Sequence, residues 1–111
     1  MKRIEGIIQP HRLSKVVTAL HALPRFPGFT TFGAHGQGRG RGRGGHFAYG
    51  HESGLMYHER CILVVICADI EADAIAQIIS QTAHTGRPGD GIVSISAVEN
   101  VHRVRQSAGE S

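Results

Sequence analysis

The sequence predicts an α+β fold in which helices pack on one side of an antiparallel sheet. Its 111 residues are enough for one hydrophobic core and too few for a second, so a single domain over 1–111 is expected. Apolar residues make up 41% of the chain and charged residues 19%, a composition that excludes intrinsic disorder. Along the chain, apolar positions switch between the period of a strand and that of a helix, in the order β-α-β-loop-β-α-β.

The first half of the chain predicts a strand, a helix, a second strand and a long loop. Residues 2–9 carry three isoleucines and form a strand that ends at Pro10. A helix follows before Pro24, because five apolar residues recur at helical spacing. They are Leu13, Val16, Val17, Leu20 and Leu23. Residues 29–33 are the second strand, and 36–54 lack periodicity and are expected to form the loop.

The second half repeats the pattern without the long loop. Residues 55–68 contain the strongest strand, and Asp69 is the expected N-cap of a second helix. The inner face of that helix is Ile75, Ile78, Ile79 and Thr82. A glycine-rich turn at 85–91 and a strand at 92–98 complete a ferredoxin-like βαββαβ sandwich. A C-terminal tail at 101–111 follows, and its first residues, 101–105, are expected to be extended.

The strand at 61–67 also predicts an oligomer. Every residue in it is apolar, whereas a strand with one face in water should alternate between apolar and polar residues. Both faces of this strand therefore need cover, and the sequence predicts no third helix. We expect several copies of the chain to pack their sheets against one another.

Cysteine usage and apolar runs indicate a soluble, cytoplasmic domain that reaches a membrane only through a partner. Cys61 and Cys67 lie in one strand, about 20 Å apart, too far for a disulfide bond. The longest apolar run, 61–68, is too short to cross a bilayer. The first five residues lack the apolar stretch of a signal peptide.

The net charge of +3 belongs to one segment, 36–45, which contains Arg39, Arg41 and Arg43 and no acid. Six of the fifteen glycines, Gly40 among them, lie there too. Three interpretations stay open: a mobile loop that brings N–H groups and guanidinium groups to an anion, a simple linker, or an Arg-Gly segment that binds RNA. The first is favoured and no nucleic acid is expected, because the segment lies inside the domain and lacks interleaved aromatic residues.

Two further segments have the composition of an anion site. The turn 85–91 could be a plain connection, but its glycines and Arg87 suit a phosphate cradle; it lacks the G-K-[ST] ending of a Walker A loop. Arg103 and Arg105 are either a solvated edge or a pair of clamps on a polyphosphate. A metal site is a weaker alternative, and no residue pattern indicates an enzyme. The candidate metal ligands are His35, His46, His51 and His58.

Four segments together resemble the PII signal-transduction proteins. They are residues 1–10 (MKRIEGIIQP), 36–39 (GQGR), 85–91 (TGRPGDG) and 101–105 (VHRVR). The resemblance covers nearly the whole chain, and the turn is its most specific part. It implies a non-enzymatic homotrimer that binds adenine nucleotides between subunits. A long loop, the T-loop at 36–54, would report the ligand state to a partner protein.

The resemblance also implies which residues contact the nucleotide. They fall into four groups: at the adenine, at the base of the loop, in the phosphate cradle, and on the neighbouring subunit. In that order they are Ile7 and Thr30; Gly36, Gly38 and Arg39; Gly86, Arg87, Gly89, Asp90 and Gly91; and Arg103 and Arg105. Arg60 occupies the place of a phosphate-binding lysine and keeps its charge.

Departures from the family pattern change the expected ligands. Gly40 replaces a glutamine that helps to hold magnesium and 2-oxoglutarate, and Ile92 replaces a lysine. The tyrosine that some members uridylylate is absent from its place, with Tyr49 and Tyr57 elsewhere. We therefore expect ADP or AMP to bind at least as well as ATP, with a small anion such as bicarbonate as second ligand. The partner would be a transporter or an enzyme of carbon or nitrogen metabolism, or, alternatively, of metal efflux.

Overall fold

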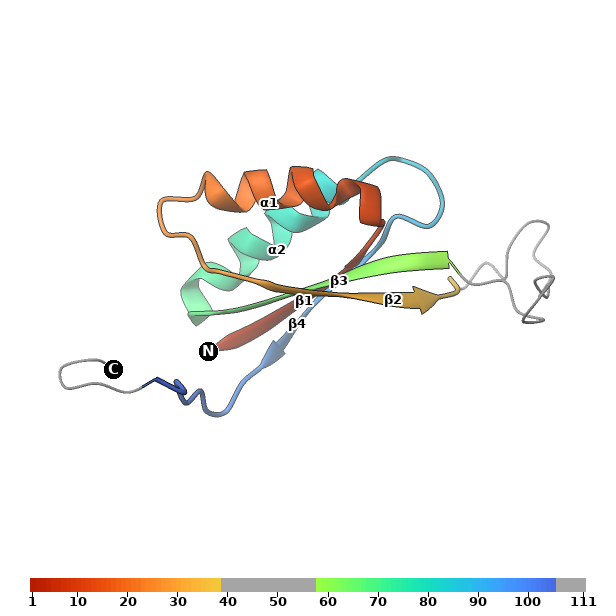
Figure 1. The fold of residues 1–111 in the computed structure, drawn as a ribbon. Coiled ribbons are helices and arrows are strands. Elements are labelled where there is room, and N and C mark those ends of the chain that lie inside the picture. Colours follow the sequence, from red (N-terminus) through yellow and green to blue (C-terminus); the bar gives the residue numbers. More distant parts are fainter. Residues whose placement is uncertain (39–57, 106–111) are drawn as a thin grey trace.

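The fold is one antiparallel sheet with two helices on one face, in a computed structural model that describes residues 1–38 and 58–105 (Figure 1). The elements are β1 (Lys2–Ile8), the 3-10 helix η1 (Pro10–Arg12), α1 (Leu13–His21), β2 (Thr30–Gly36), β3 (His58–Cys67), α2 (Asp69–Ala83) and β4 (Gly91–Ala97). The strand order is β2-β3-β1-β4, with every neighbouring pair antiparallel. The predicted ferredoxin-like sandwich is confirmed. No helix in the described ranges is long and apolar enough to span a membrane.

The core lies between the helices and the sheet. The most deeply buried side chains come from the inward positions of β1 and β3 and from one face of each helix. They include Ile4, Ile8, Val16, Leu20, Leu63, Val65 and Ile79. Gly6 lets α2 approach β1 closely, since a Cβ there would lie 3.1 Å from Cγ2 of Ile79. The guanidinium of Arg12 ties the helices together by donating to the carbonyl of Thr82 at 2.7 and 3.2 Å.

Two predicted boundaries were wrong. Strand β2 runs on to Gly36 instead of ending at residue 33, because its last residues pair with β3, Gly36 opposite His58. Backbone hydrogen bonding to a neighbouring strand outweighs the low strand propensity of glycine there. Asp69 is not the N-cap but the first residue of α2, and Ala68 precedes it. The carboxylate of Asp69 lies 2.8 Å from the N-terminal amine of Met1 instead.

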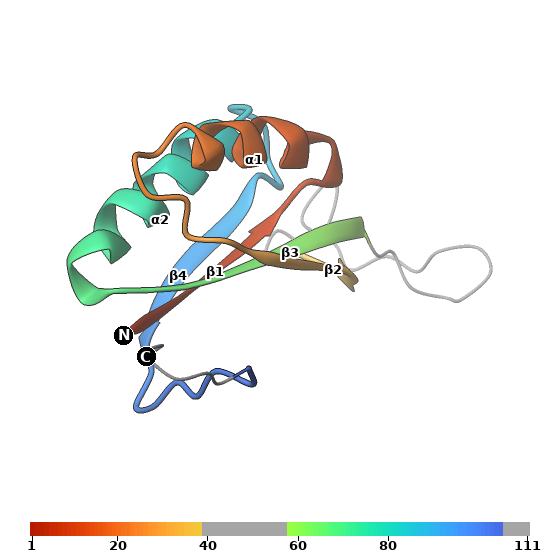
Figure 2. The same ribbon diagram turned by 60° about the vertical axis from the view of Figure 1, so that its left-hand side comes forward.

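The face of the sheet opposite the helices is uncovered (Figure 2). A row of apolar residues crosses all four strands on it, because Phe32 pairs with Ile62, Ile62 with Ile7, and Ile7 with Ile92. Phe32 is 51% exposed and Ile92 65% exposed. This apolar face is what the strand at 61–67 predicted, and the trimer that would cover it stays a prediction.

Both cysteines face the helices. Cys61 and Cys67 are free and buried, and burial raises the pKa of both thiols. They alternate with Ile62, Val64 and Ile66 of the uncovered face along β3. Both cysteines are therefore free thiols of the core, as the sequence predicted.

Candidate functional site

The turn between α2 and β4 is held together by one carboxylate. Asp90 accepts hydrogen bonds from the backbone N–H of Thr85 (2.8 Å), from the hydroxyl of Thr85 and from the N–H of Gly86 (3.1 Å). Nδ1 of His84 lies 3.2 Å from the same carboxylate. The hydrogen bonds from Thr85 lower the pKa of Asp90 to about 2. The Asp90 carboxylate is thus engaged inside the turn, and what Asp90 offers a ligand is its backbone N–H.

Glycine is required in this turn at the point where it meets β1. Gly91 has a φ of +108°, and a Cβ there would lie 1.8 Å from the carbonyl oxygen of Ile7. Gly86 and Gly89 also have positive φ, at +82° and +88°. The turn is therefore pressed against the end of β1, which brings it beside Ile7.

A guanidinium from β3 reaches the same turn. Nη2 of Arg60 lies 3.4 Å from the position that a Cβ of Gly89 would take. On the other side, Nε2 of Gln9 donates to the carbonyl of Gly89 at 3.0 Å. Gly36 is close as well, since its Cβ would lie 3.9 Å from Cγ of Arg60. Residues predicted from four separate segments thus meet at one end of the sheet.

Fewer backbone N–H groups of the turn are free to bind an anion than the sequence predicted. The N–H groups of Thr85 and Gly86 bond to Asp90, and that of Arg87 donates to the Thr85 hydroxyl at 3.2 Å. Within the described residues, no hydrogen bond uses the N–H of Gly89 or of Asp90. The backbone donors of the turn that remain for an anion are the N–H groups of Gly89 and Asp90, and the guanidinium of Arg60 lies beside them.

Two hollows flank this cluster. One, of about 550 Å³, lies along β2 and β3 beside the start of α1 and includes Arg60 in its wall. The other, of about 140 Å³, lies under the turn and includes Asp90 and Gly91. Neither of these two hollows has both Arg60 and a residue of the turn in its wall.

Comparison with known proteins shows to which family the chain belongs. The model of the family "Nitrogen regulatory protein P-II" matches residues 1–108. The chain belongs to the P-II family. Members of this family are regulatory signal-transduction proteins, generally without enzymatic activity, that act as trimers and interact with target proteins.

Curated relatives match over almost the whole chain. The nitrogen regulatory protein P-II of Azospirillum brasilense is 36% identical over 107 residues, covering 95% of this chain and 92% of that protein. The protein of that name from Rhizobium meliloti is 37% identical with the same coverage. The nitrogen fixation nifHD region GlnB-like protein 1 of Methanothermobacter marburgensis is 31% identical over 112 residues, covering 95% and 94%.

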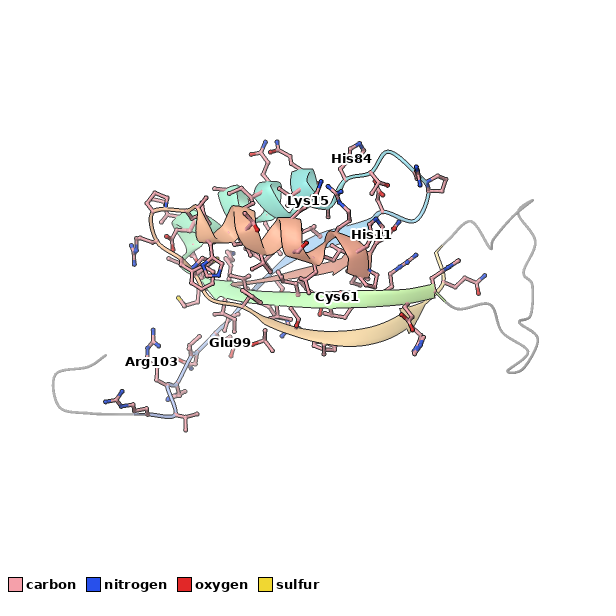
Figure 3. All side chains as sticks on the ribbon, turned by 45° about the horizontal axis from the view of Figure 1, so that its top comes forward. His11, Lys15, Cys61, His84, Glu99 and Arg103 are labelled. Carbon is pink, nitrogen blue, oxygen red and sulfur yellow. The ribbon has the colours of Figure 1, made fainter. Side chains whose placement is uncertain are left out.

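The other predicted contacts of this P-II chain lie apart from the turn. Thr30 is exposed at the start of β2, opposite Val64 of β3. Arg103 lies at the opposite end of the molecule from His84 (Figure 3). Residues 101–105 form no strand, and the chain bends at 104 and 105, so the extended tail predicted for Arg103 and Arg105 is wrong there.

Part of the prediction falls on residues outside the described ranges. These are Arg39, Gly40, Arg41, Arg43, His46, His51, Tyr49 and Tyr57. Gly38 is described, and a Cβ on it would meet nothing within 4 Å. His35 and His58 lie on the neighbouring strands β2 and β3. Where the chain is described, no three His, Cys, Asp or Glu residues group as metal ligands.

Sequence reasoning missed Gln9. The residue follows β1 directly and precedes Pro10, a position that suggests only the end of a strand. Its contact with Gly89 joins residues 80 positions apart. No pattern within either segment indicates that contact.

Proposed function

We propose that the chain is a non-enzymatic sensor that binds an adenine nucleotide between the subunits of a trimer. The observation that carries the proposal is the cluster of Arg60 and the free N–H groups of Gly89 and Asp90. A guanidinium beside converging backbone donors is a favourable place for a phosphate. Ile7, which the turn contacts, would then lie against the adenine.

The second half of the site would come from the tail of a neighbouring subunit. Arg103 and Arg105 are exposed and, within the described residues, make no hydrogen bond or ion pair. In one chain Arg103 lies far from His84 at the start of the turn (Figure 3). A trimer that buries the apolar sheet face would offer them a partner turn, and two more cations would then face the phosphates.

The nucleotide preferred should be ADP or AMP, with ATP bound no better. Ile92 projects from β4 next to Ile7 and is 65% exposed, so an apolar side chain stands where a cation could meet a third phosphate. Gly40 brings no magnesium ligand. The γ-phosphate of ATP would therefore meet less positive charge, because both a side-chain cation and a magnesium ligand are missing.

A small planar anion, with bicarbonate as the leading candidate, is proposed as the second ligand. Arg39, Gly40, Arg41 and Arg43 combine guanidinium forks with glycine backbone, which suits three oxygens without a metal. Nucleotide and anion together would favour an ordered T-loop and change the surface offered to a target transporter or enzyme. Because the coupling is reciprocal, bicarbonate should tighten ADP as much as ADP tightens bicarbonate.

Calorimetry with ADP, AMP and ATP, with and without magnesium, tests the nucleotide proposal. We expect ADP or AMP to bind at least as tightly as ATP. Repeating the ADP titration with bicarbonate or 2-oxoglutarate, at matched pH and ionic strength, tests the second ligand. A marked magnesium-dependent preference for ATP, or an effect of 2-oxoglutarate without one of bicarbonate, would contradict the ligand assignment. Absence of any nucleotide binding would refute the proposed function.

A further inference from the structure

We propose that Gln9 is a positioning residue that orients the peptide between Gly89 and Asp90 toward the nucleotide phosphate. This inference rests on the proposed function and deepens it. The side-chain amide of Gln9 donates to the carbonyl of Gly89 at 3.0 Å. Gln9 touches the carbonyl and not the ligand, so its effect on binding is indirect.

The backbone of Gln9 is itself fixed. Its carbonyl accepts a hydrogen bond from the N–H of Arg12 at 3.0 Å, which closes the 3-10 turn η1. Pro10 follows and restricts the backbone further. The Gln9 side chain therefore starts from a rigid point at the end of β1, and it reaches the turn from there.

A bond to the Gly89 carbonyl also sets the direction of the Asp90 N–H. In a trans peptide the C=O and the following N–H point to opposite sides of the chain. With the oxygen of Gly89 held on Gln9, the N–H of Asp90 faces away from Gln9. No acceptor for that N–H is present within the described residues, so it is a donor available to a ligand.

Without Gln9, no other hydrogen bond within the described residues would hold the Gly89 carbonyl. This peptide turns about ψ of Gly89 and φ of Asp90, and glycine, here at a φ of +88°, tolerates a wide range of backbone angles. A rotated peptide would present the carbonyl oxygen in place of the N–H and repel a phosphate. The carboxylate of Asp90 fixes residues 85 and 86 and does not hold the Gly89 carbonyl.

The neutral amide of Gln9 complements the charge of Arg60. Nε2 of Gln9 and Nη2 of Arg60 lie 3.8 and 3.4 Å from the Cβ position of Gly89, so the two side chains flank the same residue. Gln9 donates to the carbonyl of Gly89, whereas Nη1 of Arg60 donates to the carbonyl of Glu59 at 3.2 Å. The remaining donors of the guanidinium stay available for the phosphate.

The test compares ADP with adenosine in the full-length protein. Gln9→Met removes the donor at nearly constant size, Gln9→Glu replaces it with an acceptor, and Gln9→Lys keeps a donor. Gln77→Met, at an exposed position of α2, is the matched control. We expect Gln9→Met to weaken ADP about three- to tenfold while adenosine affinity stays unchanged. Gln9→Glu should weaken ADP more, and Gln9→Lys and Gln77→Met should bind ADP no more weakly than the wild type.

An NMR measurement reports the peptide directly. The amide resonance of Asp90 should shift on adding ADP to the wild type, and this shift should be reduced in Gln9→Met. Equal ADP affinity in the wild type and Gln9→Met, or an equal loss for ADP and adenosine, would overturn the role of Gln9 alone. Failure of the wild type to bind ADP would refute the proposed function, and the role of Gln9 with it.

Discussion

The turn at 85–91 and the tail at 101–105 are both candidate phosphate sites, but they are built in opposite ways. The turn is braced by the Asp90 carboxylate, by Gln9 and by its contact with Ile7. The tail is exposed and makes no hydrogen bond or ion pair within the described residues. Under the proposed function, a single chain holds one braced half of the site and one half that has no partner within the described residues.

Under the proposed function, this difference indicates where the nucleotide would bind. A rigid cradle presents donors with little loss of entropy on binding, whereas an exposed arginine gains a partner only when another subunit brings a ligand to it. Because members of the P-II family act as trimers, the two halves can meet between chains. The predictions below test each half in turn.

The largest effect is expected at the junction of the turn with β1. Gly91→Ala would place a Cβ 1.8 Å from the carbonyl oxygen of Ile7 at a φ of +108°. We expect it to lower the free energy of unfolding by about 3 kcal/mol. Chemical denaturation measures this loss. Gly33→Ala is the control, since a Cβ at Gly33 meets nothing within 4 Å, and equal stability of the two variants would contradict the described junction.

The next largest effect concerns the charges on the two halves. Arg60→Ala and Arg103→Ala should each weaken ADP about tenfold to a hundredfold, because each loses a guanidinium–phosphate pair. Lys15→Ala, an exposed change on α1, should leave ADP affinity unaltered. Calorimetry distinguishes them. Unchanged affinity in Arg103→Ala would remove Arg103 from the site.

The bracing of the turn predicts a pH dependence. The pKa of Asp90 is about 2 in the folded chain, below the ordinary 3.8, so the carboxylate form is favoured by folding. This stabilisation is complete above the ordinary pKa and is lost as the pH falls from about 4 toward 2. Asp90→Asn should lower the melting temperature at pH 7 and flatten its decline in that window. Asp73→Asn, on the exposed side of α2, should keep the wild-type decline, and an unchanged profile for Asp90→Asn would exclude Asp90 as the brace.

The smallest effect concerns which nucleotide the turn prefers. Ile92→Lys adds a cation next to Ile7, at a position that is 65% exposed in the single chain. ATP should tighten relative to ADP about three- to fivefold, the range of an exposed ion pair. Competition between the two nucleotides measures the ratio. If the ratio does not move, Ile92 is not what sets the preference for fewer phosphates.

Apolar periodicity was enough to predict the fold. Most of the inward residues predicted for β1, β3 and both helices pack in the core, whereas Val17 and Thr82 of the predicted helix faces are not part of it. The turn could also be predicted from the sequence. Gly86, Gly89 and Gly91 have positive φ, a conformation that favours glycine, so the turn is marked by its glycine content.

The sequence did not predict contacts that depend on how distant segments are aligned with one another. Strand β2 extends to Gly36 because β3 offers it partners, and Gln9 gains its role only because α2 and β4 return the chain to the end of β1. Asp69 was expected as an N-cap, yet the nearby amine of Met1 binds its carboxylate. In each case a contact with a segment distant in the sequence decided the outcome.

The central claim, one site made by two subunits, is tested most directly by mixing variants. Arg60→Ala and Arg103→Ala chains, each weak alone, are refolded together in equal amounts and titrated with ADP. In a cyclic trimer about a quarter of the interfaces should pair an intact Arg60 of one chain with an intact Arg103 of its neighbour and regain wild-type affinity. A mixture that binds no better than the separate variants would show that both arginines act within one chain, or that the tail plays no part.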